Sequence, residues 1–273
     1  MLLGVGAALA AAAVFGSASV LQAAAARTAA PAQGLDPRLL LVLLRQPTFV
    51  AALLLNLLGF VLHLVALRLV PLFLAQAGIA ASLAVTALLA VRVFGDRLGR
   101  REWSAVGAVC GGLALLTAAA GATGAERADP TLEATLGAGV AALVVVGAVV
   151  GRARGSWTVW GLSGMAGLGF ATTAVSGRLL PALTPADLLG APVTYVLASA
   201  GALSFLLYSM ALQRGEVTPA TSPMIVLQTV TPAVVGVLAL GDEVRTGWLP
   251  TAALGLVLTV VGAVTLARFE DMR

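Results

Sequence analysis

The sequence has one cysteine, one histidine and no lysine, and only 10% of its 273 residues are charged. A lone cysteine, Cys110, excludes a disulfide scaffold. The sixteen arginines are scattered between apolar segments, so no basic patch indicates nucleic-acid binding. The sequence also lacks G-x-S-x-G, H-E-x-x-H, P-loop and paired-cysteine signatures. It therefore predicts no enzyme, no cofactor and no dedicated metal site.

What the chain has instead is apolar surface. Apolar residues make up 60% of the sequence, and the mean hydropathy is +1.02. Soluble globular proteins are typically about 45–50% apolar and about 25% charged. No long polar stretch leaves room for a domain outside a membrane. The composition therefore predicts a membrane protein with several spans.

Apolar runs bounded by charge, proline or glycine predict an all-α polytopic protein with about nine membrane-spanning helices, each near the roughly 17–25 residues that a span needs. The expected spans are 2–26, 48–69, 71–94, 102–121, 134–151, 156–177, 192–213, 219–241 and 248–267. The first has no positively charged leader, so we interpret it as an uncleaved anchor. The segment 36–47 is too short to cross and is expected to be an interfacial helix or a lead-in to the second span.

The arginines predict an orientation. With nine spans, twelve arginines fall on one side of the membrane and four on the other: Arg68, Arg127, Arg178 and Arg245. Short cytoplasmic loops are enriched in basic residues. We therefore expect a cell-membrane protein with its N-terminus outside and its C-terminus in the cytoplasm.

The two halves of the sequence share markers at similar spacing. Ala66-Leu67, Phe94-Gly95-Asp96 and Trp103 in the first half match Ala211-Leu212, Leu240-Gly241-Asp242 and Trp248 in the second. Matching spans are five apart, so the copies are expected to have opposite orientations in the membrane. The predicted organisation is a four-span repeat over 1–121, a connecting span with loops over 122–155, and a second four-span repeat over 156–273.

These motifs resemble the drug/metabolite transporter superfamily, and in particular its EamA-like branch. There, a span closing in Ala-Leu, a proline-bearing span ending in Leu-Gly-Glu and a glycine-rich span recur in each half, with Asp96 and Asp242 here replacing the usual glutamate. The nine-span topology is more similar to the NIPA magnesium-transporter relatives. The resemblance implies an inverted-repeat fold and transport, and inverted-repeat carriers bind substrate near the midplane between their copies.

Within the spans, the residues that could line a cavity are mostly uncharged. All twelve acidic residues lie at span ends or in loops, which disfavours a magnesium site built from carboxylates. Amides, hydroxyls and one imidazole remain, although such groups also join helices by hydrogen bonds. The candidate cavity residues are Asn56, His63, Gln76, Tyr208 and Gln228.

Prolines and small residues complete the set of candidates. Pro71, Pro223 and Pro232 are candidate hinges, because proline frees backbone carbonyls and permits bending. Gly107-x-x-x-Gly111 forms a small-residue face for helix packing. The sequence does not decide between a monomer and a homodimer.

These observations predict a secondary transporter. It would move a small organic solute across the bilayer by alternating access. The sequence leaves two alternatives: a NIPA-like divalent-cation transporter, and a membrane protein of the same fold that transports nothing.

Overall fold

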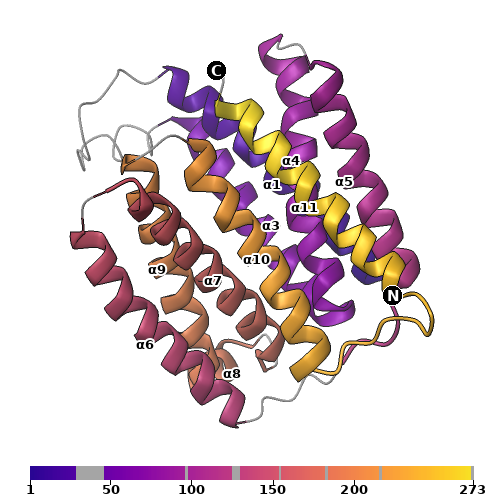
Figure 1. Ribbon diagram of the computed structural model, residues 1–273, viewed down its shortest axis with the longest axis vertical. Coiled ribbons are helices and arrows are strands. Elements are labelled where there is room, and N and C mark those ends of the chain that lie inside the picture. The colour runs from indigo at the N-terminus through magenta and orange to yellow at the C-terminus, as the bar shows by residue number, and fades with distance from the viewer. Residues whose placement is uncertain are drawn as a thin grey trace.

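The computed structural model describes residues 1–28, 46–95, 98–124, 130–153, 155–181, 184–214 and 217–271, which form a bundle of helices (Figure 1). Most of the expected segment 36–47 lies outside these ranges. The helices of the described chain are α1 (Leu2–Thr28), α3 (Pro47–Leu69), α4 (Leu72–Phe94), α5 (Arg100–Ala119), α6 (Pro130–Arg152), α7 (Trp157–Leu179), α8 (Pro185–Gly190), α9 (Pro192–Arg214), α10 (Val217–Ala239) and α11 (Leu249–Asp271).

Eight helices of the described chain are long and apolar enough to cross a membrane: α1, α3, α4, α5, α6, α9, α10 and α11. The remaining expected span, 156–177, coincides with α7, which has 23 residues. This helix is less apolar because glycine, serine and threonine stand where other spans have larger apolar residues. Most of α7 is buried against α9 and α10, so protein rather than lipid surrounds it. The chain is therefore an all-helical, multi-pass membrane protein.

The helices pack in a pattern that recurs in the two halves. Helix α1 packs against α3 and α4, and α7 packs against α9 and α10. Helices α3, α4, α9 and α10 all have 23 residues, and α3 and α4 begin 145 residues before α9 and α10 (47 to 192 and 72 to 217). The halves are joined by contacts of α4 with α10 and α11, of α5 with α11, and of α3 with α7. Helix α6 packs outside this pattern, on α7 and α9.

The bundle has two ends that differ in charge. At the lower end in Figure 1, α3, α7 and α10 end and α4 and α11 begin. Arg68, Arg178 and Arg245 lie there among the described residues. At the upper end the described helices carry Arg92, Arg100, Arg101, Arg152 and Arg214. The described arginines thus divide between the two ends as the sequence predicts, while Asp96 and Arg127 lie outside the described residues.

Glycine contacts set the packing of α5 against α11. A Cβ on Gly112 would lie 2.4 Å from Thr259 Oγ1 and 2.6 Å from the carbonyl oxygen of Gly255, so only glycine fits this approach. Gly107 and Gly111, in contrast, have nothing within 4 Å and are exposed. The prediction that Gly107-x-x-x-Gly111 forms a packing face is therefore wrong for contacts within this chain. The packing face instead contains Val109, Gly112 and Leu116, which the rotation of α5 points inward.

Gly112→Ala should destabilise the bundle, whereas its neighbour Gly111→Ala should not. The added methyl at residue 112 meets the backbone of α11, and overpacking of this kind typically costs about 1–3 kcal/mol. Thermal unfolding in detergent measures both variants. Equal unfolding temperatures for the two would contradict the assigned rotation of α5.

Candidate functional site

A buried ion pair lies at the lower end of the bundle. Arg178, in the last turn of α7, donates from Nη2 to Asp242 Oδ1 at 2.7 Å, and both side chains are completely buried. Asp242 follows α10 in the loop that leads to α11. Charged side chains are seldom fully buried unless they are paired. This fully buried pair is therefore the polar feature of the described chain from which we build the site.

Arginines also join α3 to α7. Arg178 Nη1 donates to the carbonyl oxygens of Leu67 and Val70, the latter at 2.8 Å, at the end of α3. In the reverse direction, Arg68 of α3 donates to the carbonyl oxygens of Leu180 and Pro181, just after α7. The last carbonyls of a helix have no partner within the helix. Each arginine thus satisfies carbonyl groups at the end of the other helix.

The carboxylate of Asp242 is satisfied by three elements. Besides Arg178, Oδ1 accepts from the backbone N–H of Gly124 at 2.9 Å, in the segment after α5. Oδ2 accepts from the N–H of Leu72 at 2.6 Å, in the first turn of α4. Pro71, which precedes Leu72, has no side chain that could cap this helix. Asp242 therefore caps α4 from another part of the chain, where the helix dipole also favours a negative charge.

The loop that carries Asp242 is held by backbone hydrogen bonds. An antiparallel bridge pairs Ala120 with Val244, and Glu243 exchanges backbone bonds of 2.9 Å with Gly121 and Ala122. Gly241 has a φ of 73°, in the left-handed region that favours glycine. Gly95, its counterpart in the first half, has the same φ. The loop before α11 is thus tied to the segment after α5, and the Gly-Asp motif turns the chain so that Asp242 points inward.

We call Arg178, Asp242, Arg68 and the bridged segments 119–124 and 240–245 the lower clamp. Its hydrogen bonds connect the ends of α3, α5, α7 and α10 with the start of α4. Burying two charges costs several kcal/mol per ion, which is offset only where geometry and additional hydrogen bonds are favourable. Asp242 has three donors and Arg178 two further acceptors, so the clamp meets this condition.

The candidate cavity residues lie at different depths. His63 is six residues before the end of α3 and Gln76 four residues after the start of α4, so they lie about 9 Å and about 6 Å along their helices from the lower end. Asn56 and Gln228 lie near the middles of α3 and α10. Tyr208 lies six residues before the upper end of α9.

Their contacts differ as well. His63 is 7% exposed, and its Nδ1 has no hydrogen-bond partner among the described residues. Gln76 is also buried, at 4% exposed. Asn56 Nδ2 donates to the carbonyl of Ala52 on its own helix. Buried polar atoms are normally hydrogen-bonded, so the unpartnered nitrogen of His63 is the strongest indication of a polar ligand among these residues.

Tyr208 joins two helices near the upper end. Its hydroxyl lies 2.7 Å from Thr221 Oγ1, which connects α9 with α10. Gln228 is partly buried on α10. No described contact gathers the five candidates into one site, and their assignment to a cavity stays a prediction.

The three candidate hinge prolines occupy two kinds of position. Pro71 precedes α4 as its N-cap residue, whereas Pro223 and Pro232 lie inside α10. Next to Pro223, the N–H of Met224 donates to Ser163 Oγ of α7 at 3.2 Å. A side chain that inserts into a helix in this way accompanies bending.

Sequence reasoning did not recognise the ion pair as a site. In the sequence, Arg178 indicates only topology and Asp242 belongs to a repeated motif, and nothing links these two residues 64 positions apart. One usable signal was present, since Asp242 belongs to the Gly-Asp motif of the repeat. Among the described residues, no three His, Cys, Asp or Glu side chains group as metal ligands, so no described cluster supports the divalent-cation alternative.

Comparison with known proteins adds no assignment. No family model, curated protein or solved structure matches this chain.

Asp242→Asn should destabilise the protein strongly. The substitution leaves Arg178 buried without a counter-charge, and breaking a buried pair in this way costs about 3–5 kcal/mol. Glu243→Gln is the matched control, because Glu243 is exposed and its backbone bonds do not depend on its side chain. Thermal unfolding in detergent measures both. If the two variants unfold at the same temperature, the carboxylate of Asp242 does not hold the clamp together.

Proposed function

We propose that this protein is a secondary transporter that moves a small organic solute across the cell membrane by alternating access between two inverted halves. The observation that carries the proposal is the matched packing of α1 on α3 and α4 with that of α7 on α9 and α10. Inverted repeats of this kind are an architecture of secondary transporters. The proposal includes membership of the drug/metabolite transporter superfamily, of the EamA-like kind with NIPA-like topology, which rests on the sequence motifs.

Nine membrane crossings are part of the proposal, the eight most apolar helices and α7. Helix α7 has 23 residues, as α9 and α10 do, and a helix enclosed by these two needs less apolar surface than one that faces lipid. Helix α6 is the crossing that gives the second copy its inverted orientation. The 1–121 and 156–273 repeats then contribute α4 and α10 to the centre, where these two helices contact each other.

The lower clamp supports the two-state part of the proposal. It holds the lower end closed, and it is not duplicated in the sequence of the other half. With Phe15 aligned to Phe170, the counterpart of Arg178 is Ala23. Where bonds hold one end closed and no matching bonds hold the other, the conformational equilibrium without solute favours the state that is open at the other end. We infer that the upper end opens in the resting state and that release of the clamp opens the lower end.

The proposed solute is neutral or weakly charged. The candidate groups between the ends of the bundle are an imidazole, amides and a phenol (His63, Gln76, Gln228, Asn56 and Tyr208). Convergent groups of this type fix the orientation of a small polar ligand within a mostly apolar site. The arginine-rich upper end is proposed to face the cytoplasm, which places the N-terminus outside.

Transport is tested with the full chain in proteoliposomes, by uptake and exchange of a panel of amino acids, nucleosides, amines and polyols. We expect flux of at least one class. The substitution Gln228→Leu should reduce it more than Ser209→Ala, a change at a half-buried serine of α9 whose hydroxyl donates to the Phe205 carbonyl of its own helix. No flux of any solute from folded protein would contradict the proposal.

Opening of the lower end is tested by cysteine modification. In a Cys110→Ser background, the variant Gln228→Cys should react faster with a water-soluble thiol reagent applied at the lower end when Asp242→Asn is added, because the clamp is weakened. Glu243→Gln should leave the rate unchanged. Equal rates in all three backgrounds would show that the clamp does not control access.

A further inference from the structure

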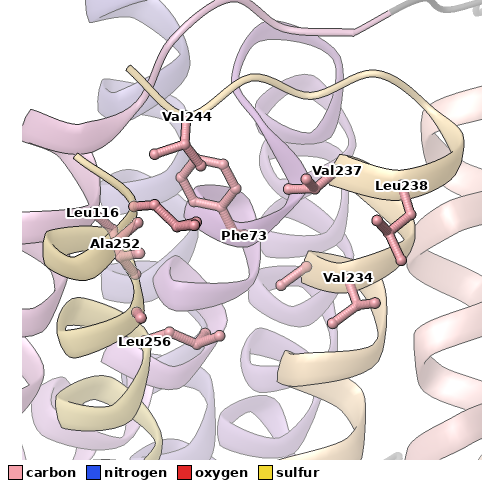
Figure 2. Close-up of a pocket in the computed structure, with 11 residues that line it drawn as sticks. Phe73, Leu116, Val234, Val237, Leu238, Val244, Ala252 and Leu256 are labelled. Carbon is pink, nitrogen blue, oxygen red and sulfur yellow. The ribbon is translucent and has the colours of Figure 1, made fainter. Parts of the chain in front are cut away.

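An apolar crevice of about 270 Å³ lies beside the lower clamp (Figure 2). Its walls come from four helices and one loop, and its lining is almost entirely carbon. Representative residues are Phe73 of α4, Leu116 of α5, Val234 and Val237 of α10, Val244 of the clamp loop and Leu256 of α11.

The crevice opens on the outer surface of the bundle. Val234, Leu238 and Leu249 belong to its lining and are 47%, 80% and 66% exposed. Trp248, 38% exposed, immediately precedes Leu249, with the Arg245 guanidinium carbon 5.5 Å from its ring centroid. Tryptophan is enriched at membrane–water interfaces. The mouth of the crevice therefore faces the bilayer hydrocarbon next to the interface.

The crevice replaces a helix contact. Helix α4 packs against α11, but its counterpart α10 makes no comparable contact with α5 in the described part of the chain. Leu116 of α5 and Val237 of α10 instead face the crevice. The clamp forms one end of the crevice, since Val244 of the clamp belongs to the lining. Asp242 ties the end of α10 to α4 and α7, while the Ala120–Val244 bridge ties the loop before α11 to α5.

We propose that this crevice binds one alkyl chain of a bilayer phospholipid. A buried water needs two to four polar partners, which the lining does not offer. An empty space would deprive the lining side chains of dispersion contacts. A helix of a second copy, about 10 Å across with its side chains, is too thick for a space of this volume. An alkyl chain is thin and apolar, and the bilayer supplies it at the mouth.

The bound chain fills the space between α10 and α5 and so supports the end of the helix that carries Pro223 and Pro232. The protein is therefore stabilised by phospholipid at this place, whether or not it carries a solute. The site is independent of the proposed transport, which uses the interior of the bundle.

The site is tested with delipidated protein in detergent and a phosphatidylcholine that carries a photoreactive group in one acyl chain. After irradiation, we expect label on peptides covering 233–238 and 249–256 at about fivefold the level on the exposed α6 face, 141–149. Ala253→Phe and Val237→Phe, which fill the crevice from α11 and α10, should each remove this excess. Ala142→Phe, on the exposed surface of α6, is the matched control and should keep it.

A second measurement does not depend on labelling. Added phosphatidylcholine should raise the unfolding temperature of the wild type and of Ala142→Phe more than that of Ala253→Phe, because a bound ligand stabilises the folded state. Label spread evenly over all exposed apolar faces, or unchanged in both filled variants, would overturn the proposal. Crosslinks between two chains at the crevice would also overturn it. Absence of transport would leave these results unaffected.

Discussion

The ion pair between Arg178 and Asp242 is the interaction on which the lower end of this protein depends. It brings together residues from α7 and from the loop after α10, and it satisfies backbone groups of α3 and α4 that those helices cannot satisfy themselves. A charge buried in a membrane protein is tolerated only where partners surround it. The geometry of the helix ends is therefore set by the need to partner these two charges.

The clamp lies beside an asymmetry in a bundle whose halves otherwise pack alike. Where α4 meets α11, the helices are in contact, and where α10 would meet α5, an apolar crevice remains. The clamp bonds join the loop after α10 to the segment after α5, and the crevice begins beside that junction, at Val244. The two features are thus neighbours at the lower end of the bundle.

Much of the fold was predictable because its signals are local. Apolar runs gave the helices, and the spacing of Gly95 and Gly241 marked two turns that have the same backbone conformation. The rotation of each helix about its axis was not predictable, since it is set by contacts with distant helices. For that reason Gly111 was expected to pack where Gly112 does. Pairing of Arg178 with Asp242 lay beyond sequence reasoning for a similar reason, because only the folded bundle brings them together. The five cavity candidates share a polar residue type. Residue type does not determine the position along the length of the bundle, and the five lie at several heights in it.

The order in which the chain is made gives the clamp a further consequence. Leu72 and Asp242 are separated by 170 residues, and Arg178 precedes Asp242 by 64. During synthesis, α4 and α7 are therefore complete while the carboxylate that partners both has not yet been made. Until the Gly241-Asp242 turn emerges, the first half holds an uncapped helix start and α7 holds an arginine without its counter-charge. The lower end can form only after α10 and the turn that follows it have been made, so its assembly waits for both halves of the bundle.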